Sequence, residues 1–141
     1  TMSKQFIEVQ QMQHLQETGI KFKATILYWA RCVDNKPRAA SRYGKWVLIK
    51  GNNAQTVGLM HWEFMPAYTL QDVLDALPEY IYDSTEQYLL GINMFFKYIR
   101  YSRFNDVLTK RNFDRTPIID AAYSMLCWVI ENKFVETNKN E

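Results

Sequence analysis

The stretch 116–134, TPIIDAAYSMLCWVIENKF, constrains the fold more than any other part of the chain. Read as a helix, it is apolar around most of its circumference and leaves only a narrow polar stripe, formed by Asp120, Ser124 and Glu131. Thr116 is placed to cap the helix and Pro117 to take its first position. With about 15 residues it is shorter than the ~20 that span a bilayer. We therefore expect a core helix that the remaining chain covers.

The length of 141 residues predicts a single domain, which we place at 1–135, with a frayed tail at 136–141. A hydrophobic content of 48% excludes a disordered chain. The aromatic content of 15% favours strands or an interface over a plain helical bundle. The start TMSKQF has no apolar segment of the kind a secretory signal needs, and we expect a cytoplasmic protein without a membrane anchor.

The net charge of +2 is spread unevenly along the sequence. Residues 1–60 carry +6, residues 61–91 carry −6, residues 92–115 carry +4 and residues 116–141 carry −2. This pattern is compatible with a dipolar surface that selects partners by its field. Pairing between the blocks in the folded chain is the interpretation that we favour.

The first half of the chain reads as one helix followed by strands. The helix runs from Phe6 or Ile7 to Thr18 and ends at Gly19. The β-branched and aromatic stretch 24–33 predicts a strand, and a basic loop follows at 34–44. We expect residues 45–50 and 56–64 to pair as a hairpin, because Gly51-Asn52-Asn53 between them is favourable turn chemistry.

The second half begins with a helix that Thr69 and Asp72 cap and Pro78 ends. Its apolar residues follow helical spacing: Leu70, Val73, Leu74, Leu77 and Ile81. The stretch 88–103 fits either a helical stripe or two alternating strands, and we favour a hairpin. Residues 104–115 read as a polar connection into the last helix.

Together these elements predict an α+β fold. We expect an antiparallel sheet of two β-hairpins plus a preceding strand, packed against about three helices, with the C-terminal helix in the core.

Three segments carry a resemblance: QQMQHLQETGI, PAYTLQDVLDALPEYI and IIDAAYSMLCWVIENKF. They resemble a group of small, uncharacterised proteins from gut Bacteroidetes that are often encoded in prophage-like or other mobile regions. The resemblance covers about Gln10 to Phe134 and implies the same α+β order, with residues 88–103 as strands. The chain departs from that group in its longer basic loop at 34–45 and in the apolar stretch 92–96. The group implies no known activity, so no functional residue is carried over.

No catalytic motif can be read, and we expect a protein that is not an enzyme and holds no metal or cofactor. His61 and Glu63 have the H-x-E spacing of zinc deaminases, but the required P-C-x-x-C pair is missing, and a cross-strand surface explains them more simply. Cys32, beside Arg31, and Cys127 are candidate nucleophiles, and two structural free thiols are the simpler interpretation. The polar stripe on the last helix lines a cleft or forms its solvent edge.

Interleaved basic and aromatic residues give the strongest binding signal, because such residues bind phosphates and stack on bases in single-strand binders. They lie at 31–46 and 97–103, and the candidate nucleic-acid-binding residues are Arg31, Lys36, Arg38, Arg42, Tyr43, Lys45, Trp46, Lys97, Arg100 and Arg103. Both groups would form one basic face if the hairpins shared a sheet. The alternative is an ordinary solvated surface, since +2 is a modest charge for a nucleic-acid-binding domain.

The leading functional hypothesis is a small non-enzymatic interaction or accessory protein, derived from a mobile element, with an unknown protein as its partner. A nucleic-acid-binding module is the alternative. Homodimerisation through a strand edge or through exposed aromatic residues is compatible with both.

Overall fold

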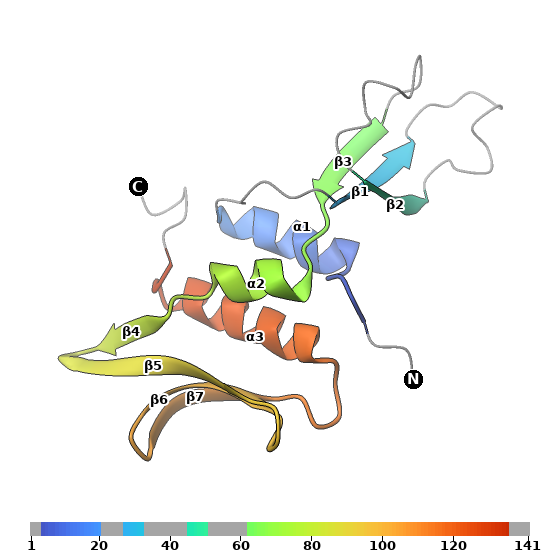
Figure 1. Ribbon diagram of the computed structural model, residues 1–141. Coiled ribbons are helices and arrows are strands. Elements are labelled where there is room, and N and C mark those ends of the chain that lie inside the picture. Colours follow the sequence, from blue (N-terminus) through green and yellow to red (C-terminus); the bar gives the residue numbers. More distant parts are fainter. Residues whose placement is uncertain (1–3, 21–26, 33–44, 51–61, 136–141) are drawn as a thin grey trace.

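The computed structural model describes residues 4–20, 27–32, 45–50 and 62–135 (Figure 1). These residues form three helices, α1 (Val9–Thr18), α2 (Leu70–Ala76) and α3 (Ile118–Glu131). Three strands form one antiparallel sheet in the order β2 (Trp46–Lys50), β1 (Leu27–Cys32) and β3 (Trp62–Pro66). Four more form a second, in the order β4 (Tyr80–Asp83), β5 (Glu86–Asn93), β6 (Tyr98–Arg103) and β7 (Asp106–Asn112). The predicted α+β class is confirmed.

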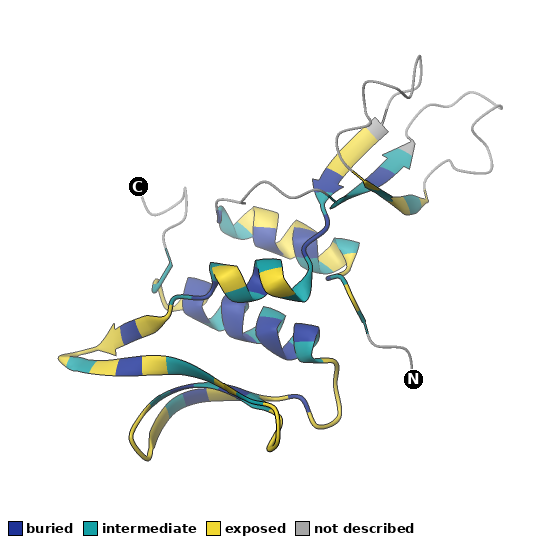
Figure 2. Ribbon diagram, in the orientation of Figure 1, coloured by how far each residue is buried: buried dark blue, intermediate teal, exposed yellow. Residues whose placement is uncertain are grey.

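Helix α3 is the centre of the hydrophobic core, as predicted. It packs against α1, α2, β6 and β7, and Figure 2 shows buried residues along most of its length. Its buried side chains are Ile119, Ala121, Ala122, Met125, Leu126, Val129 and Ile130. Burial of each large apolar side chain stabilises the fold by roughly 2 kcal/mol. The cover on several sides explains why the sequence of α3 is apolar around most of its circumference.

The start of α3 differs from the prediction. Pro117 is the N-cap, in an extended conformation with ψ of 142°, and its carbonyl accepts the N–H of Ala121 at 3.3 Å. Thr116 lies one position too early to cap the helix. Its hydroxyl instead donates to the carbonyl of Asn112, at the end of β7, over 3.5 Å.

Helix α1 begins at Val9, later than the predicted Phe6 or Ile7, but its end and the start of α2 follow the sequence signals. Gly19 ends α1 in the left-handed conformation, with φ of 80°, which glycine adopts without a steric penalty. Thr69 and Asp72 form the predicted capping box on α2. The Thr69 hydroxyl accepts from the Asp72 N–H at 3.3 Å, and the Asp72 carboxylate accepts from the Thr69 N–H at 3.0 Å.

Helix α2 ends earlier than the apolar spacing predicts. It stops at Ala76, two residues before Pro78, because proline disfavours a helical conformation in the residue before it. Ile81 therefore belongs to β4, where it pairs with Tyr88, and is not the last member of a helical stripe.

The three-stranded sheet contradicts the predicted hairpin of 45–50 with 56–64. β2 and β3 do not pair with each other in the described residues but lie on opposite edges of β1, with Trp29 opposite both Leu48 and Met65. The favourable turn residues at 51–53 lie outside the described residues. Turn chemistry acts locally and does not decide which strand is the neighbour, and the connection is long enough to cross the ~10 Å between the two edges.

The four-stranded sheet is an up-and-down meander. Its middle strands β5 and β6 are the predicted hairpin at 88–103, which is confirmed. The predicted connection at 104–115 is wrong over most of its length, because residues 106–112 form β7. Polar residues such as Lys110 fit this position, since β7 is an edge strand with one partner.

The strands form two sheets where the sequence predicted one. Figure 1 shows the four-stranded sheet beneath α3 and the three-stranded sheet on the opposite side of the helices, beyond α1. Among the described residues, no helix is both long and apolar enough to cross a membrane. The predicted tail at 136–141 lies outside the described residues.

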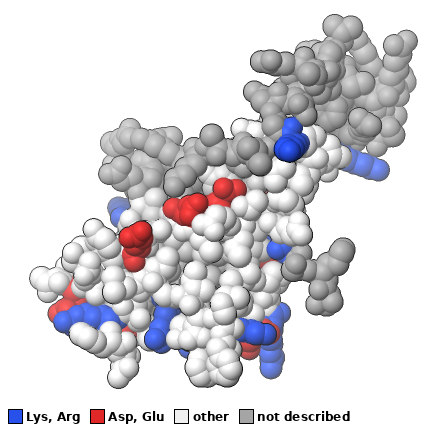
Figure 3. All heavy atoms as spheres, viewed as in Figure 1, with Lys and Arg blue, Asp and Glu red and all other residues white. Residues whose placement is uncertain are grey.

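Ion pairs join the charge blocks of the sequence. Arg31 binds Glu63 at 2.6 Å and Arg103 binds Glu86 at 2.7 Å, so both basic blocks are paired with the acidic block 61–91. Figure 3 shows acidic side chains over α2 and basic ones along the four-stranded sheet. The pairs support the interpretation that part of the charge pattern serves the folded chain internally.

We expect Thr69→Ala to lower the free energy of unfolding by about 1 kcal/mol, because it removes the acceptor for the Asp72 N–H at the start of α2. Urea denaturation followed by circular dichroism measures the change.

Thr116→Ala is the matched control, since this hydroxyl does not cap α3 and its one bond is long. We expect a loss of about 0.5 kcal/mol or less. Equal losses in the two variants would contradict the assignment of the two helix starts.

Candidate interaction surface

The two faces of the four-stranded sheet differ in burial. Ile81, Tyr88, Ile99 and Tyr101 are buried on the face that packs against the helices. Since side chains alternate along a strand, the residues between them point away from α3. We call this side the outer face and define it by Tyr80, Tyr82, Leu89, Tyr98, Arg100 and Lys110.

Aromatic side chains lie on the outer face at two places. On β4, the rings of Tyr80 and Tyr82 are exposed and meet edge to face, with centroids 5.8 Å apart. On β6, the Tyr98 ring has the Arg100 guanidinium 4.7 Å from its centroid and the Lys110 ammonium at 5.8 Å. Aromatic and basic groups are thus already in contact on one surface.

The aromatic turn, residues 94–97, joins β5 to β6 and displays its rings. Phe95 is 84% exposed and Phe96 is 67% exposed, and the two rings meet edge to face at 4.9 Å. The Asn93 side-chain oxygen accepts the N–H groups of Phe95 and Phe96 at 3.0 and 2.8 Å. The backbone of this turn is therefore fixed while its apolar side chains point into solvent.

Phe104, in the turn between β6 and β7, is 87% exposed and has φ of 55°, a left-handed conformation that bulky residues rarely adopt. Together with Leu89 and Ser102 it lines a shallow hollow of about 350 Å³ at this end of the outer face. Arg103 and Gln87 complete the lining.

The predicted basic residues do not share one sheet, and the premise of a joint basic face is wrong. Arg31 and Trp46 belong to the three-stranded sheet, whereas Arg100 belongs to the four-stranded sheet. The candidates within the loop, Lys36, Arg38, Arg42 and Tyr43, lie outside the described residues.

Two of the predicted arginines are already engaged by acidic neighbours. Arg31 binds Glu63 and lies over the Trp46 ring at 4.7 Å. Arg103 binds Glu86. Lys45 and Lys97 are exposed, as the prediction requires of a binding residue.

The sequence prediction does not include Lys110, because it treats 104–115 as a connection. The alternation of Val107, Thr109 and Arg111 was the available signal for a strand, and it would have placed Lys110 on the opposite side from Thr109. The structure places Lys110 directly across from Arg100.

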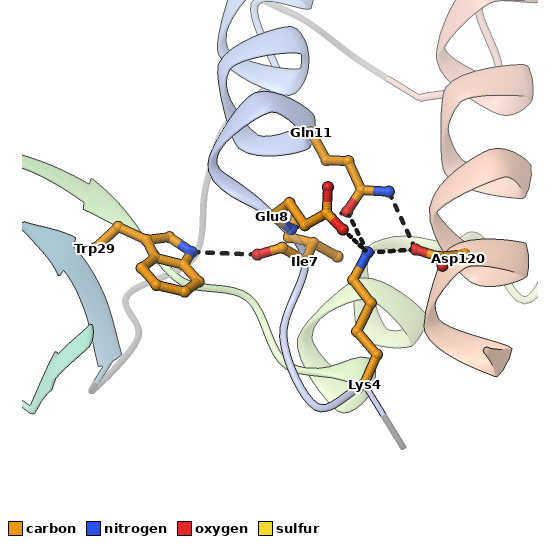
Figure 4. A network of polar contacts seen from close by, with 6 residues as sticks. All are labelled: Lys4, Ile7, Glu8, Gln11, Trp29 and Asp120. Carbon is orange, nitrogen blue, oxygen red and sulfur yellow. Dashed lines mark hydrogen bonds and ion pairs between the residues drawn. The ribbon is translucent and has the colours of Figure 1, made fainter. Parts of the chain in front are cut away.

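The polar stripe on α3 makes tertiary contacts (Figure 4). The Asp120 carboxylate lies 2.5 Å from the Lys4 ammonium and accepts from the Gln11 amide at 3.1 Å. Lys4 also contacts Glu8 at 3.2 Å. Ser124 accepts from the Arg111 guanidinium at 2.8 Å. Asp120 and Ser124 therefore attach α3 to the N-terminal segment and to β7, and Glu131 alone is the solvent edge.

The N-terminal segment is also tied to the three-stranded sheet. The Trp29 indole on β1 donates to the carbonyl of Ile7 at 3.1 Å, and Figure 4 shows this bond beside the Lys4 contacts. The Ile7 N–H donates to the carbonyl of Tyr68, just before α2, at 3.0 Å.

The residues singled out for metal or nucleophile chemistry have ordinary surroundings where the structure describes them. No group of three or more potential metal ligands lies within the described parts of the chain. Glu63 is bound to Arg31, and His61 lies outside the described residues. Cys127 is a free thiol, and burial raises its pKa above the ordinary value of 9.0 although the neighbouring Tyr123 hydroxyl opposes the shift. The side chain of Cys32 is not described.

Comparison with known proteins finds no family model that matches the chain, no similar curated protein and no matching solved structure. The resemblance to the gut Bacteroidetes group stays a prediction.

We expect Asp120→Asn to lower the free energy of unfolding by about 1 to 2 kcal/mol, since the partly buried Lys4 ammonium loses the nearer and less exposed of its two charged partners. Glu131→Gln removes the exposed carboxylate of the same polar stripe and should change the free energy of unfolding by about 0.5 kcal/mol or less. Chemical denaturation of both variants measures the difference. An unchanged stability of Asp120→Asn would show that the negative charge of Asp120 contributes nothing to the fold.

We expect Cys127 to react slowly with a disulfide reagent at pH 8, because only the thiolate reacts and a raised pKa reduces its fraction. In a Cys32→Ser variant, Cys127 should react more slowly in the folded protein than in the same protein unfolded in urea. The reaction rate of Cys127 in the folded protein should rise with pH and reach half of its maximum above pH 9.0. A folded protein that reacts faster than the unfolded one would point to an activated thiol.

Proposed function

We propose that this chain is a small, non-enzymatic interaction protein whose binding surface is the outer face together with the aromatic turn. The observation that carries the proposal is the concentration of exposed apolar side chains on one sheet. Nine of the twelve large hydrophobic residues that are exposed in the described parts lie on the four-stranded sheet or in its turns: Tyr80, Tyr82, Leu89, Ile92, Met94, Phe95, Phe96, Phe104 and Val107.

Exposed apolar groups on this scale indicate a partner. Single exposed hydrophobic residues are normal, but contiguous apolar patches on monomers mark interaction sites. The residue types also fit, because Tyr, Phe, Met and Arg are enriched in interfaces and are frequent among the residues that dominate binding.

The scaffold supports such a role. The Asn93 side chain fixes the backbone under Phe95 and Phe96, and the buried face of the sheet is attached to the core through Ile99 and Tyr101. A surface that is ordered before binding loses less conformational entropy when its partner arrives.

The partner is an unknown protein, which the exposed apolar surface supports. An accessory role in a mobile element completes the proposal and rests on the resemblance described above. Homodimerisation would use the same apolar surface. The nucleic-acid alternative is favoured by one observation, the contact of Tyr98 with Arg100 and Lys110, and it now rests on the four-stranded sheet alone.

The test is capture from a nuclease-treated bacterial lysate with purified, immobilised protein, followed by quantitative mass spectrometry. Phe95→Ser with Phe96→Ser should abolish retention of specific proteins, because the two most exposed rings of the aromatic turn are lost. Gel filtration of the same samples detects a dimer that the double variant dissociates.

Leu48→Ser with Phe64→Ser is the matched control. It removes two exposed apolar side chains from the three-stranded sheet and should leave the captured set unchanged. If the control variant loses the captured proteins as well, or if neither variant changes anything, the assignment of the surface is wrong.

A further inference from the structure

The centre of the outer face is an ordered grid that the strand register defines. Tyr98 lies between Asn93 on β5 and Asn112 on β7. In the next row, Arg100 lies between Gly91 and Lys110. An aromatic ring, two cations and two side-chain amides thus occupy neighbouring positions on three adjacent strands.

The two cations of this grid are not neutralised by carboxylates. No ion pair joins Arg100 or Lys110 to an acidic side chain in the described parts of the structure, and both instead contact the Tyr98 ring. Arg103 differs, since Glu86 binds it.

The acidic residues of the sheet take the opposite side. Asp83 is two residues from the buried Ile81, Glu86 is two residues from the buried Tyr88, and both therefore have inward positions. Asp106 accepts the hydroxyl of Tyr88, at 3.1 Å. The outward positions of β4, β5 and β6, together with residues 110 and 112 of β7, carry two positive charges, Arg100 and Lys110, and no negative charge. Such a surface suits an anionic ligand.

Gly91 is an independent indication that something approaches this face. Glycine within a strand weakens the sheet and often marks a close approach of a ligand. The backbone of Gly91 does not have the positive φ that requires glycine, and a Cβ atom there would meet nothing within 4 Å. Neither conformation nor internal packing explains the residue, and it leaves open space beside Arg100.

We propose that the occupant of this space is a single-stranded nucleic acid. A base stacks against Tyr98 and Arg100 over the backbone of Gly91, while Arg100 and Lys110 bind the neighbouring phosphates. The side-chain amide of Asn112 bonds to a base edge, while Asn93 keeps its bonds to the aromatic turn. A duplex keeps its base faces stacked inside and offers no ring to this site. An acidic peptide satisfies the charges but leaves Tyr98 and the space over Gly91 uncovered.

This inference rests on the proposed function, because it uses the same outer face as a binding surface, and it adds a nucleic-acid ligand to the protein partner proposed there. It assigns Tyr98 and Lys110 to the site in addition to the predicted Arg100, and it does not require Arg31 or the loop residues.

The test is fluorescence anisotropy with labelled single strands of about 12 nucleotides, oligo(dT) and oligo(U), at about 50 and 200 mM salt. A duplex and a polyglutamate peptide serve as competing ligands. We expect the single strands to bind at least about tenfold more tightly than the duplex, with an affinity that falls as salt rises.

Two sets of variants separate stacking from charge. Gly91→Val should raise the melting temperature, since valine favours a strand, and should weaken binding by about tenfold or more because its side chain fills the space of the base. If that variant does not fold, Tyr98→Leu tests the same base contact. Arg100→Gln with Lys110→Gln should reduce the slope of log affinity against log salt by about 1.4, the value for two phosphate contacts on a single strand.

Lys133→Gln is the control for nonspecific attraction, since it removes an exposed cation that follows α3 and lies outside the sheet, and it should leave the affinity nearly unchanged. No binding of single strands, or tighter binding of polyglutamate, overturns the inference. If Phe95→Ser with Phe96→Ser still loses its captured proteins in that case, the proposed function stands and only the nucleic-acid partner fails. If both experiments show nothing, both proposals fail.

Discussion

The burial of α3 on several sides at once is the constraint that the other elements satisfy. A helix that is apolar around most of its surface needs cover from more than one direction, and α1, α2, β6 and β7 each supply part of it. Its few polar groups then need partners, because a polar group that loses water without a new hydrogen bond is destabilising. Lys4 supplies the partner for Asp120 and Arg111 the partner for Ser124. The N-terminal segment that supplies Lys4 also contains Ile7, whose carbonyl accepts the N–H of the Trp29 indole. The core helix is thereby connected to the three-stranded sheet.

Features that depend on neighbouring residues could be predicted from the sequence. The left-handed end of α1 at Gly19, the capping box of Thr69 with Asp72 and the hairpin at 88–103 each depend on interactions within a few residues or within one alternating segment. Ile81 shows where such reasoning fails, because its spacing continues a helical stripe that Pro78 had already ended. The pairing of β1 with both β2 and β3 could not be predicted, since partner choice depends on contacts between distant segments.

The candidate surface likewise combines features that the sequence predicts with features that depend on contacts between distant segments. The sequence identified Arg100, Arg103 and Lys97 as one basic group, but it could not show that Glu86 neutralises Arg103. It also could not place Lys110 across from Arg100, because that requires the register of β6 with β7. Which charges face outward is decided by strand alternation and pairing, and a count of charges along the chain does not contain this information.

Gly91 and Phe104 together imply a conflict between stability and use of the surface. In a sheet optimised only for stability, a β-branched residue would occupy 91, and glycine would occupy 104, where φ is 55°. The chain has the reverse at both positions, and each choice costs about 1 kcal/mol. Both residues shape the outer face, because Gly91 leaves open space at its centre and Phe104 lines the hollow at its end. Selection of this chain for heat resistance would therefore favour substitutions at the very positions that shape its binding surface, and its most stable variants would be the least able to bind.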